Sequence, residues 1–558
     1  MASPAPDDGY IGGVNPSTSL ARAVIAQLLA NGVDHLVVCP GSRNAPLLLA
    51  AHRAAAAGRV RLHVRHDERV AGFTAYGIAR VTGRPVPVIT TSGTAVGNLL
   101  PAVMEAAHGG VPLVVVSADR PTGMLDTGAN QTTNQVAIFG TFVRAEANLE
   151  ADAGALVVRH QVARVLAAAD GMRTRGPGPG HLNVRFAEPL LPAAADASTD
   201  WLDVDAPAIA PLGAGMLTEL PAGPRTVVLA GSGGRATGAR ARRAAEEAGV
   251  PLLAGPISNA RAGAALATYR LLLDTPLADR IERVVVYGRP TLSRPVTRLL
   301  SRTDVEVVVV TDASEWSDVG LHASIVADEV LLPAGEPDWL AEWRDADARA
   351  GAALAQLLGA EPRLTGPEVA AAVVASVGPE DVLMLGNSQV LRDADLAPVA
   401  AAPSYVIGNR GLSGIDGLVS TATGAGIGLG TPVTALVGDV SMVHDAGGLL
   451  VGPGEERPDL RVVVANDDGG AIFHTLEQGD PGYAAGPYEG AFERLFGTPH
   501  GVDLSALAVA YGWRHVRVAT RAELAEALAG PVHGRELVEV PLSRTDRRDV
   551  DRRIRGLV

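Results

Sequence analysis

The sequence predicts an α/β protein built from three doubly wound domains, each around a parallel sheet. Short β-branched runs alternate along the chain with longer segments in which Ala, Leu and Arg recur at helical spacing. This alternation is typical of βα units, whose strands pair in parallel. The length of 558 residues is sufficient for three or four domains with a core each.

The first domain is expected to span residues 1–192. Apolar runs and amphipathic periodicity predict strands at Leu36–Cys39, Val86–Thr90 and Leu113–Ser117, and helices at Ser19–Asn31 and Glu68–Thr82. The stretch Pro192–Pro211 that follows is rich in Ala, Asp and Pro and is typical of a linker.

A central domain is expected over residues 193–358 and a third domain over residues 359–558, with the boundary near Gly359–Pro367. The strands predicted in the central domain are Thr226–Ala230, Val284–Tyr287 and Val305–Thr311. Those predicted in the third domain are Val382–Leu385, Tyr405–Ile407, Val433–Val437 and Leu460–Ala465, followed by a less regular tail.

The composition is that of a globular enzyme, with 47% hydrophobic and 19% charged residues. A formal net charge of −14 speaks against a nucleic-acid or anionic-membrane surface, which needs a basic footprint. The single cysteine, Cys39, excludes an internal disulfide and a multi-cysteine zinc site. The uncharged stretch Gly417–Gly438 is broken by Pro432 and is expected to form a buried helix and a core strand. The first residues lack the features of a secretory signal, so we expect a cytoplasmic protein without integral membrane contact.

Two strand ends in the third domain carry the residues of a metal site. Gly438-Asp439 follows one predicted strand, and Asn466-Asp467-Asp468-Gly469 follows another. Ligands of open α/β sheets bind at the carboxyl ends of the strands. Carboxylate and carbonyl oxygens suit Mg²⁺, which fills its remaining positions with water and phosphate oxygens. The two groups together predict a metal–diphosphate anchor, whereas either group alone is more typical of an ordinary strand-to-loop turn.

Small-residue turns follow several other predicted strands and leave N–H groups free for an anion. Turns and loops of this kind, many of them with Arg, Asn or Gln, are Pro40–Asn44, Ser92–Thr94, Ser117–Pro121, Gly128–Gln131, Gly386–Arg392 and Gly408–Asp416. Because the planar guanidinium of Arg matches a carboxylate bidentately, several such loops indicate a substrate with more than one carboxylate. Taken singly, each Arg is more typical of a structural ion pair.

Three further features of the sequence are open to simpler explanations. Glu68 begins a predicted amphipathic helix, where a carboxylate is often only a favourable first-turn charge. His63 and His66 lack a third suitably spaced ligand and are not predicted to bind a metal. The glycine loop Gly231–Gly234 lacks the full dinucleotide fingerprint, so a plain βα turn is favoured.

Together these segments closely resemble the thiamine-diphosphate enzymes and, among them, the MenD family of 2-succinyl-5-enolpyruvyl-6-hydroxy-3-cyclohexene-1-carboxylate synthases of menaquinone biosynthesis. The resemblance extends from about Asn15 to about Val502. The motifs occur in the family's order and are Cys-Pro-Gly-Ser-Arg-Asn-Ala-Pro, His-Asp-Glu-Arg, Thr-Ser-Gly-Thr-Ala, Ser-Ala-Asp-Arg-Pro, Gly-Ala-Asn-Gln, Asn-Arg-Gly-Leu-Ser-Gly-Ile-Asp-Gly and Asn-Asp-Asp-Gly-Gly-Ala-Ile-Phe. The resemblance implies pyrimidine-binding, central and diphosphate-binding domains. It also implies a homodimer or dimer of dimers, because such enzymes build the active site from the first domain of one subunit and the last of another.

The resemblance implies thiamine diphosphate with Mg²⁺ or Mn²⁺ as cofactors. Glu68 would hydrogen-bond the aminopyrimidine nitrogen N1′ and favour the imino tautomer, and Ile415 would hold the cofactor in its bent conformation. The metal ligands would be Asp439, Asp467 and the carbonyl of Gly469. The other cofactor contacts would come from Gly386, Ser388, Gly438, Ser441, Asn466 and Ile472.

The implied reaction is the decarboxylation of 2-oxoglutarate followed by 1,4-addition of the succinyl carbanion to isochorismate. Because both substrates are dianions, the site would meet up to four carboxylates, which accounts for the Arg-bearing loops. The catalytic residues would be Glu68, Ser388, Arg392 and Arg410. The substrate positions would be Ser42, Arg43, Arg120, Asn130, Gln131, Arg294, Ser388, Arg392 and Arg410, with Ile472 and Phe473 as an apolar wall.

The chain departs twice from the family's cofactor motif, which is Gly-Asp-Gly, a spacer and Asn-Asn. Val440 replaces a glycine, which matters little if only the backbone faces the diphosphate. Asp467 replaces an asparagine, which keeps an oxygen ligand but adds a charge beside the diphosphate. We expect this added charge to make cofactor binding more dependent on the metal.

Three other functions fit parts of the sequence. An acetolactate-synthase-like carboligase would share the anchor and Glu68 but would not need Arg120, Arg392 and Arg410 together. A binding module could keep the cofactor site without catalysis, although the presence of Glu68 speaks against it. A flavin- or nucleotide-binding protein would use Gly231–Gly234 and has the least support.

Overall fold

The computed structural model describes residues 14–213, 215–402 and 404–558. The N-terminal residues considered above for a secretory signal lie outside this range. The chain divides into two compact units. The first unit contains the chain up to Leu212 with Val451–Glu456, and the second unit contains Gly213–Leu450 with Arg457–Val558. Large parallel sheets in both units confirm the predicted α/β class, while the division into three domains remains a prediction.

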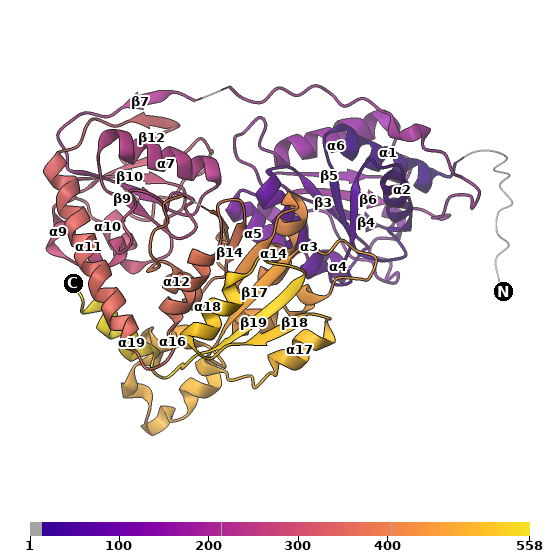
Figure 1. The fold of residues 1–558 in the computed structure, drawn as a ribbon. Helices are drawn as coiled ribbons and strands as arrows, with labels where there is room; N and C mark the ends of the chain where they lie inside the picture. Colours follow the sequence, from indigo (N-terminus) through magenta and orange to yellow (C-terminus); the bar gives the residue numbers. More distant parts are fainter. Residues whose placement is uncertain (1–13, 214, 403) are drawn as a thin grey trace. The chain divides into compact units, whose positions relative to one another are not determined.

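The first unit is built around a six-stranded sheet with the order β2-β1-β3-β4-β6-β5 (Figure 1). Its strands are β1 (His35–Val38), β2 (Arg61–Val64), β3 (Val86–Thr90), β4 (Leu113–Asp119), β5 (Ala145–Leu149) and β6 (Gly180–Arg185). Its helices are α1 (Pro16–Ala30), α2 (Ala45–Ala56), α3 (Glu68–Thr82), α4 (Thr94–Gly97), α5 (Leu100–Gly109) and α6 (Ala155–Ala169).

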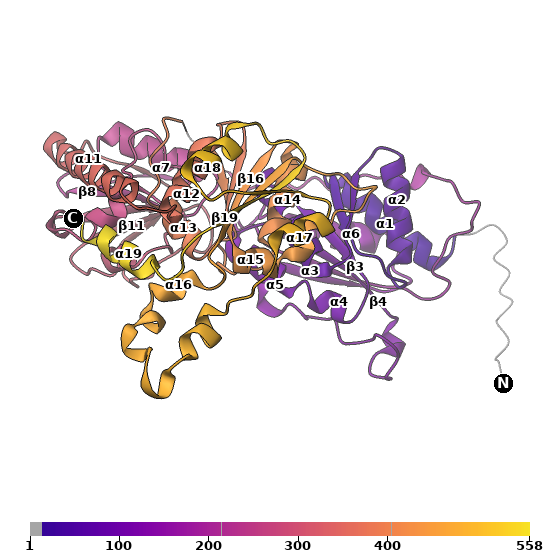
Figure 2. The same cartoon turned by 60° about the horizontal axis from the view of Figure 1, so that its bottom comes forward.

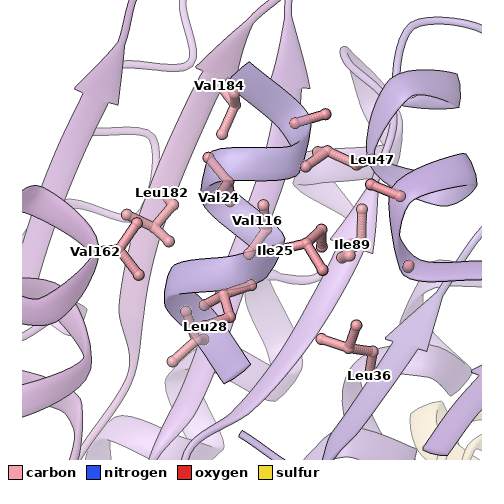
Figure 3. Packing of buried hydrophobic residues seen from close by; sticks show 14 of the residues in the cluster. Val24, Ile25, Leu28, Leu36, Leu47, Ile89, Val116, Val162, Leu182 and Val184 are labelled. Carbon is pink, nitrogen blue, oxygen red and sulfur yellow. The ribbon is translucent and has the colours of Figure 1, made fainter. Parts of the chain in front are cut away.

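Helix α1 closes one face of this sheet and forms much of its core. Its residues Val24, Ile25 and Leu28 pack among buried side chains of β1, β3, β4 and β6 (Figure 3). The helix begins three residues before the predicted start because Asn15 caps it, accepting a hydrogen bond from the Thr18 N–H at 2.8 Å. Pro16 at the first helical position suits this start, since its missing N–H would have no helical partner.

The second unit contains a five-stranded sheet with the order β12-β11-β10-β8-β9 and a two-stranded sheet of β13 and β7. The strands are β7 (Leu217–Glu219), β8 (Thr226–Ala230), β9 (Leu252–Ala254), β10 (Arg283–Tyr287), β11 (Glu306–Val310), β12 (Ile325–Ala327) and β13 (Glu329–Leu331). The helices are α7 (Arg235–Ala248), α8 (Tyr269–Leu272), α9 (Pro276–Asp279), α10 (Arg294–Leu300) and α11 (Pro337–Gly359).

Helices cover both faces of this five-stranded sheet, as the doubly wound pattern requires. Val227 and Leu229 of β8 pack with Trp339 and Trp343 of α11. The alternate residue Val228 packs with the alanines of α7 on the opposite face, because successive side chains of a strand point to opposite faces.

The second unit also contains a six-stranded sheet with the order β15-β14-β16-β17-β19-β18. The strands are β14 (Val382–Leu385), β15 (Tyr405–Ile407), β16 (Val433–Gly438), β17 (Leu460–Asn466), β18 (Arg514–Arg517) and β19 (Arg535–Pro541). The helices are α12 (Gly366–Ser376), α13 (Gln389–Ala394), α14 (Leu418–Leu429), α15 (Asp439–His444), α16 (Ala471–His474), α17 (Leu504–Ala510), α18 (Arg521–Ala529) and α19 (Arg547–Arg555). Between α16 and α17, short helical turns over residues 477–497 form a segment that extends away from this sheet (Figure 2).

The uncharged stretch Gly417–Gly438 forms the buried helix α14 and the buried strand β16, as expected. In the part of the chain that the structure describes, none of the helices combines the length and the apolar character needed to cross a membrane.

The tail after β17 is more regular than the sequence indicated. It contains β18 and β19, and β19 lies between β17 and β18. These strands have no continuous apolar run, since charged residues such as Glu536 interrupt them. Glu536 of β19 can be buried because it forms ion pairs with Arg461 of β17 and Arg514 of β18. The sequence pattern of the tail therefore resembles that of a loop, because its charged residues are neutralised only by partners on neighbouring strands.

Candidate cofactor and substrate site

A cavity of 510 Å³ lies at the carboxyl edge of the six-stranded sheet in the second unit. The loops after β14, β16 and β17 contribute to it because these three strands are neighbours in the sheet. The residues predicted from the sequence that line this cavity are Ser388, Ile415, Gly438, Asp439, Ser441, Asp467, Gly469, Ile472 and Phe473. The structure thus brings the two halves of the predicted anchor to one cavity.

Asp439 is buried at the first position of α15, directly after β16. Its Oδ2 accepts hydrogen bonds from the Gly469 N–H at 2.7 Å and from Nε2 of His500 at 3.0 Å. Burial nevertheless raises the pKa of the Asp439 carboxyl above its usual value. A cation bound next to Asp439 would stabilise its ionised carboxylate against this effect of burial.

Asp467 faces the same cavity and has an unusual environment. Its Oδ1 is buried, and no described group donates a hydrogen bond to it. Burial and, after it, the charge of Asp439 raise the pKa of Asp467 to about 8. The two neighbouring carboxylates therefore repel each other until a proton or a cation is bound between them.

The donor set fits a hard divalent cation. Asp439 and Asp467 supply carboxylate oxygens, and the carbonyl of Gly469 accepts one hydrogen bond, from the Ala471 N–H at 3.1 Å, which leaves its second lone pair. Among the described residues, no three or more His, Cys, Asp or Glu side chains form a group that could hold a metal. A cation here would therefore depend on two carboxylates, a carbonyl and oxygens of a ligand, and the metal site remains a prediction.

The loop after β17 is held by the segment Gly497–Gly501. Gly469 has φ of +144°, and a Cβ there would collide with the carbonyl oxygen of Gly497, so only glycine fits. The carbonyl of Gly497 accepts the Gly470 N–H at 2.8 Å. Oδ1 of Asp468 accepts the backbone N–H groups of His500 and Gly501 at 3.0 and 2.9 Å.

Two predicted cofactor residues of the second unit, Gly386 and Asn466, do not line the cavity. The side chain of Asn466 donates to Oε1 of Glu539 at 2.9 Å and points away, whereas Ala465 and Asp467 on either side face the cavity. This follows the alternation of side chains along a strand. Gly386 lies beneath the loop, where a Cβ would come within 3.0 Å of the carbonyl oxygen of Leu436. Their cofactor roles remain predictions.

The predicted arginines of the second unit lie outside this cavity. The guanidinium of Arg392 donates to the carbonyl of Ser388 at 2.9 Å, and burial and then the charge of Arg270 lower its pKa. Arg410 donates to Oδ1 of Asn387, a cavity residue, at 2.9 Å. Arg294 is exposed at the start of α10, and its charge also lowers the pKa of Arg392.

Sequence reasoning missed the contribution of the C-terminal residues. Leu542, Arg547 and Val550 line the cavity, and the guanidinium of Arg547 forms two hydrogen bonds with the carboxylate of Asp393. Arg544 donates to the backbone carbonyl of Asp467 at 3.0 Å. The amphipathic pattern of α19 was the available signal, but the resemblance to known motifs ended before it.

The predicted residues of the first unit lie at its own carboxyl edge, in the segments that follow β1, β2 and β4 of one parallel sheet. Arg120 is only 8% exposed and donates from one nitrogen to Ser92 Oγ and to the Gln131 carbonyl, both at 2.6 Å. Burial and then the charge of Arg43 lower the pKa of Arg120. The positive charges of the two guanidinium groups destabilise each other, so the binding of an anion next to them would be favourable.

The other predicted residues of the first unit are more open to solvent. Ser42 and Asn130 are exposed, and Arg43 donates to the carbonyl of Phe186 at 3.0 Å. Glu68 is half-buried at the first position of α3, directly after the N-cap Asp67. The structure thus groups Arg43, Arg120 and Gln131 within one unit and leaves the roles of all these residues as predictions.

Comparisons with known proteins identify the family to which the chain belongs. Residues 18–138 match the family model described as thiamine pyrophosphate enzyme, N-terminal TPP binding domain, and residues 385–540 match the corresponding C-terminal TPP binding domain. A 2-succinyl-5-enolpyruvyl-6-hydroxy-3-cyclohexene-1-carboxylate synthase of a Nocardioides species is 50% identical over 97% of this chain and 98% of its own length. Proteins of the same name from Kineococcus radiotolerans and Nocardia farcinica are 49% and 44% identical, over 95% and 98% of this chain and 97% and 100% of their own lengths. The chain is therefore an enzyme and belongs to the 2-succinyl-5-enolpyruvyl-6-hydroxy-3-cyclohexene-1-carboxylate synthase family of thiamine pyrophosphate enzymes.

Proposed function

We propose that this enzyme decarboxylates 2-oxoglutarate and adds the resulting succinyl group in a 1,4 sense to isochorismate, with thiamine diphosphate and Mg²⁺ or Mn²⁺ as cofactors. The observation that carries the proposal is the pair of carboxylates of the buried Asp439 and the partly buried Asp467, which line one cavity of 510 Å³. The unpartnered Oδ1 of Asp467 supports a metal there, and the name of the relatives supplies the product.

The residues of the second unit would hold the diphosphate end of the cofactor. Asp439, Asp467 and the Gly469 carbonyl would bind the metal, and the metal would neutralise the diphosphate. The side chain of Ile415 would support the bend of the cofactor. Thiamine diphosphate, when bound, supplies the carbanion chemistry that amino acid side chains lack.

Glu68 would act on the pyrimidine end of the cofactor. Its carboxyl group would hold a proton at the ring nitrogen N1′ and so favour the imino tautomer. A half-buried carboxylate at the start of a helix suits this task, because it is shielded from water while the helix dipole stabilises its charge.

Arg120 and Arg392 would bind substrate carboxylates. Each is a guanidinium whose pKa is lowered by burial and by a second arginine, so binding an anion would stabilise its charged form. Arg410 would add a further carboxylate contact, and Ile472 and Phe473 would form the apolar wall. This arrangement suits substrates with several carboxylates better than a monoanion such as pyruvate.

A homodimer or dimer of dimers would complete the site by pairing Glu68 of one subunit with the anchor of the other. Mixing a Glu68→Gln variant with an Asp439→Ala variant tests this assembly. If subunits exchange, a random mixture should recover about a quarter of the wild-type turnover, because half of the dimers would contain one intact site out of two. No recovery after verified exchange would contradict a shared site.

The deciding experiment combines the protein, thiamine diphosphate and Mg²⁺ with 2-oxoglutarate and isochorismate, and follows the loss of isochorismate. We expect consumption that requires all four additions and stops when EDTA is added. Consumption of pyruvate with isochorismate untouched would overturn the proposal in favour of an acetolactate-type carboligase.

A further inference from the structure

We propose that His500 is a positioning residue that decides which oxygen of Asp439 faces the metal ion. The inference rests on the proposed metal-dependent function, and it concerns a side chain that the sequence motifs did not include. His500 lies 61 residues from Asp439 in the chain, in the loop that holds the turn after β17.

Hydrogen bonds at both ring nitrogens define the state of His500. The Val502 N–H donates to Nδ1 at 3.0 Å, so Nδ1 is an acceptor and carries no proton. The proton of the neutral imidazole is therefore on Nε2, which lies 3.0 Å from Oδ2 of Asp439 and donates to it. A backbone contact thus fixes the tautomer that a carboxylate partner requires.

This donation has a consequence for the carboxylate of Asp439. Oδ2 already accepts the Gly469 N–H at 2.7 Å, so the imidazole occupies its second lone pair. Oδ1 is then the oxygen with the capacity to bind a cation. Without His500, the carboxylate would be held by fewer donors and could rotate about its Cβ–Cγ bond, presenting either oxygen.

The loop around His500 is itself attached to the metal-binding turn. The backbone N–H of His500 and that of Gly501 donate to Oδ1 of Asp468, and the Gly497 carbonyl accepts the Gly470 N–H. The side chain of His500 is 14% exposed, so bulk water competes little for Asp439. The same loop therefore holds the turn after β17, which contains Asp467 and Gly469, and orients the carboxylate of Asp439, which follows β16.

Two amide substitutions separate this role from a structural one. In His500→Gln the amide nitrogen can reach the place of Nε2 and donate to Asp439. In His500→Asn the shorter amide can reach the place of Nδ1 and accept from Val502, but it cannot reach Asp439. The exposed His533 provides a control, as His533→Gln.

The readout is the binding of Mn²⁺ in the presence of thiamine diphosphate, measured from the electron paramagnetic resonance signal of the free ion. We expect His500→Asn to weaken Mn²⁺ binding roughly ten- to hundredfold, the usual cost of losing a partner of a metal ligand. His500→Gln should remain within about threefold of the wild type, and His533→Gln should be unchanged.

Each outcome bears on one of the two proposals. Wild-type protein that binds no Mn²⁺ with thiamine diphosphate would overturn the proposed metal site itself. Wild-type binding with equally tight binding by His500→Asn would overturn the role of His500. Equal weakening in both amide variants would also overturn it, because a structural role does not distinguish the two amides.

Discussion

The two six-stranded sheets have one topology but carry close pairs of charged side chains of opposite sign at their carboxyl edges. In the order of their occurrence along the chain, the strands of both sheets follow the arrangement 2-1-3-4-6-5. The edge of the first unit carries Arg43 and Arg120, while the edge of the second unit carries Asp439 and Asp467. The fold provides the edge, and the loops that follow the strands decide which ligand it attracts.

The shifted pKa values show the same contrast. Burial and a like charge lower the pKa of Arg120 and raise that of Asp467 to about 8. The charges at each edge are therefore destabilised unless a counterion is bound. This counterion would be an anion at the first edge and a cation at the second. Variants that remove one member of each edge test whether the two edges serve one reaction.

The largest effect is expected from Glu68 in the first unit. Glu68→Gln removes the group that would hold a proton at N1′, so turnover should fall by roughly a hundredfold or more. The rate of isochorismate loss measures it. Binding of thiamine diphosphate and Mg²⁺, measured by calorimetry, should persist because the anchor is intact. Full turnover in this variant would contradict the mechanism.

A smaller loss is expected from single arginines of the two edges. Loss of one Arg–carboxylate contact costs about 1.5–3 kcal/mol, so Arg392→Ala, Arg410→Ala and Arg120→Ala should each raise KM or lower kcat roughly ten- to hundredfold. Steady-state kinetics with 2-oxoglutarate and isochorismate varied in turn would show which substrate each arginine contacts. Wild-type kinetics in Arg392→Ala and Arg410→Ala would show that these positions were assigned wrongly.

Much of the fold could be predicted because its strands are buried on both faces. The predicted strands at Val86–Thr90, Thr226–Ala230 and Val382–Leu385 coincide with β3, β8 and β14, since continuous apolar runs mark such strands. Strands β18 and β19 were missed because their charged residues, among them Glu536, are satisfied by neighbours from other strands. Pairing across a sheet is not visible in a local pattern.

The residues of the candidate site could be predicted where they directly follow a strand. They could not be predicted where they come from a distant loop and contact the site residues from there. Asp439 and Asp467 each follow an apolar run, so the sequence alone placed them at one edge. His500 and Arg544 contact the same region from irregular segments, through a ring nitrogen and a guanidinium that donates to a backbone carbonyl. No spacing rule connects such residues to the strands that they serve.

A moderate effect is expected from the charge that distinguishes Asp467 from the family's asparagine. Below about pH 8 a metal must displace a proton from this carboxyl, so Mg²⁺ binding by the wild type with thiamine diphosphate should release close to one proton near pH 7. Calorimetry in buffers of different ionisation enthalpy measures this release. Asp467→Asn should abolish it and make thiamine diphosphate binding less dependent on Mg²⁺. An unchanged dependence on Mg²⁺ would contradict the argument from charge.

The smallest effect is expected on the stability of the metal-free protein. The pKa of Asp467 is about 8 in the folded protein and roughly 3.9 in an unfolded chain. Between these values the folded state holds the extra proton, so stability falls as the pH rises through this window. Asparagine cannot ionise, so metal-free Asp467→Asn should unfold at a temperature a few degrees above the wild type near pH 8.

Thermal unfolding in EDTA from pH 4 to pH 9 measures this difference, which should vanish near pH 4, where both side chains are neutral. Saturating Mg²⁺ with thiamine diphosphate at pH 8 should reduce or reverse it, because a bound cation stabilises the ionised carboxylate. An advantage of the same size at every pH would indicate a packing effect instead. Arg120→Gln in the first unit provides the contrast, because its guanidinium stays charged throughout this range, so its effect on stability should not follow the titration of Asp467.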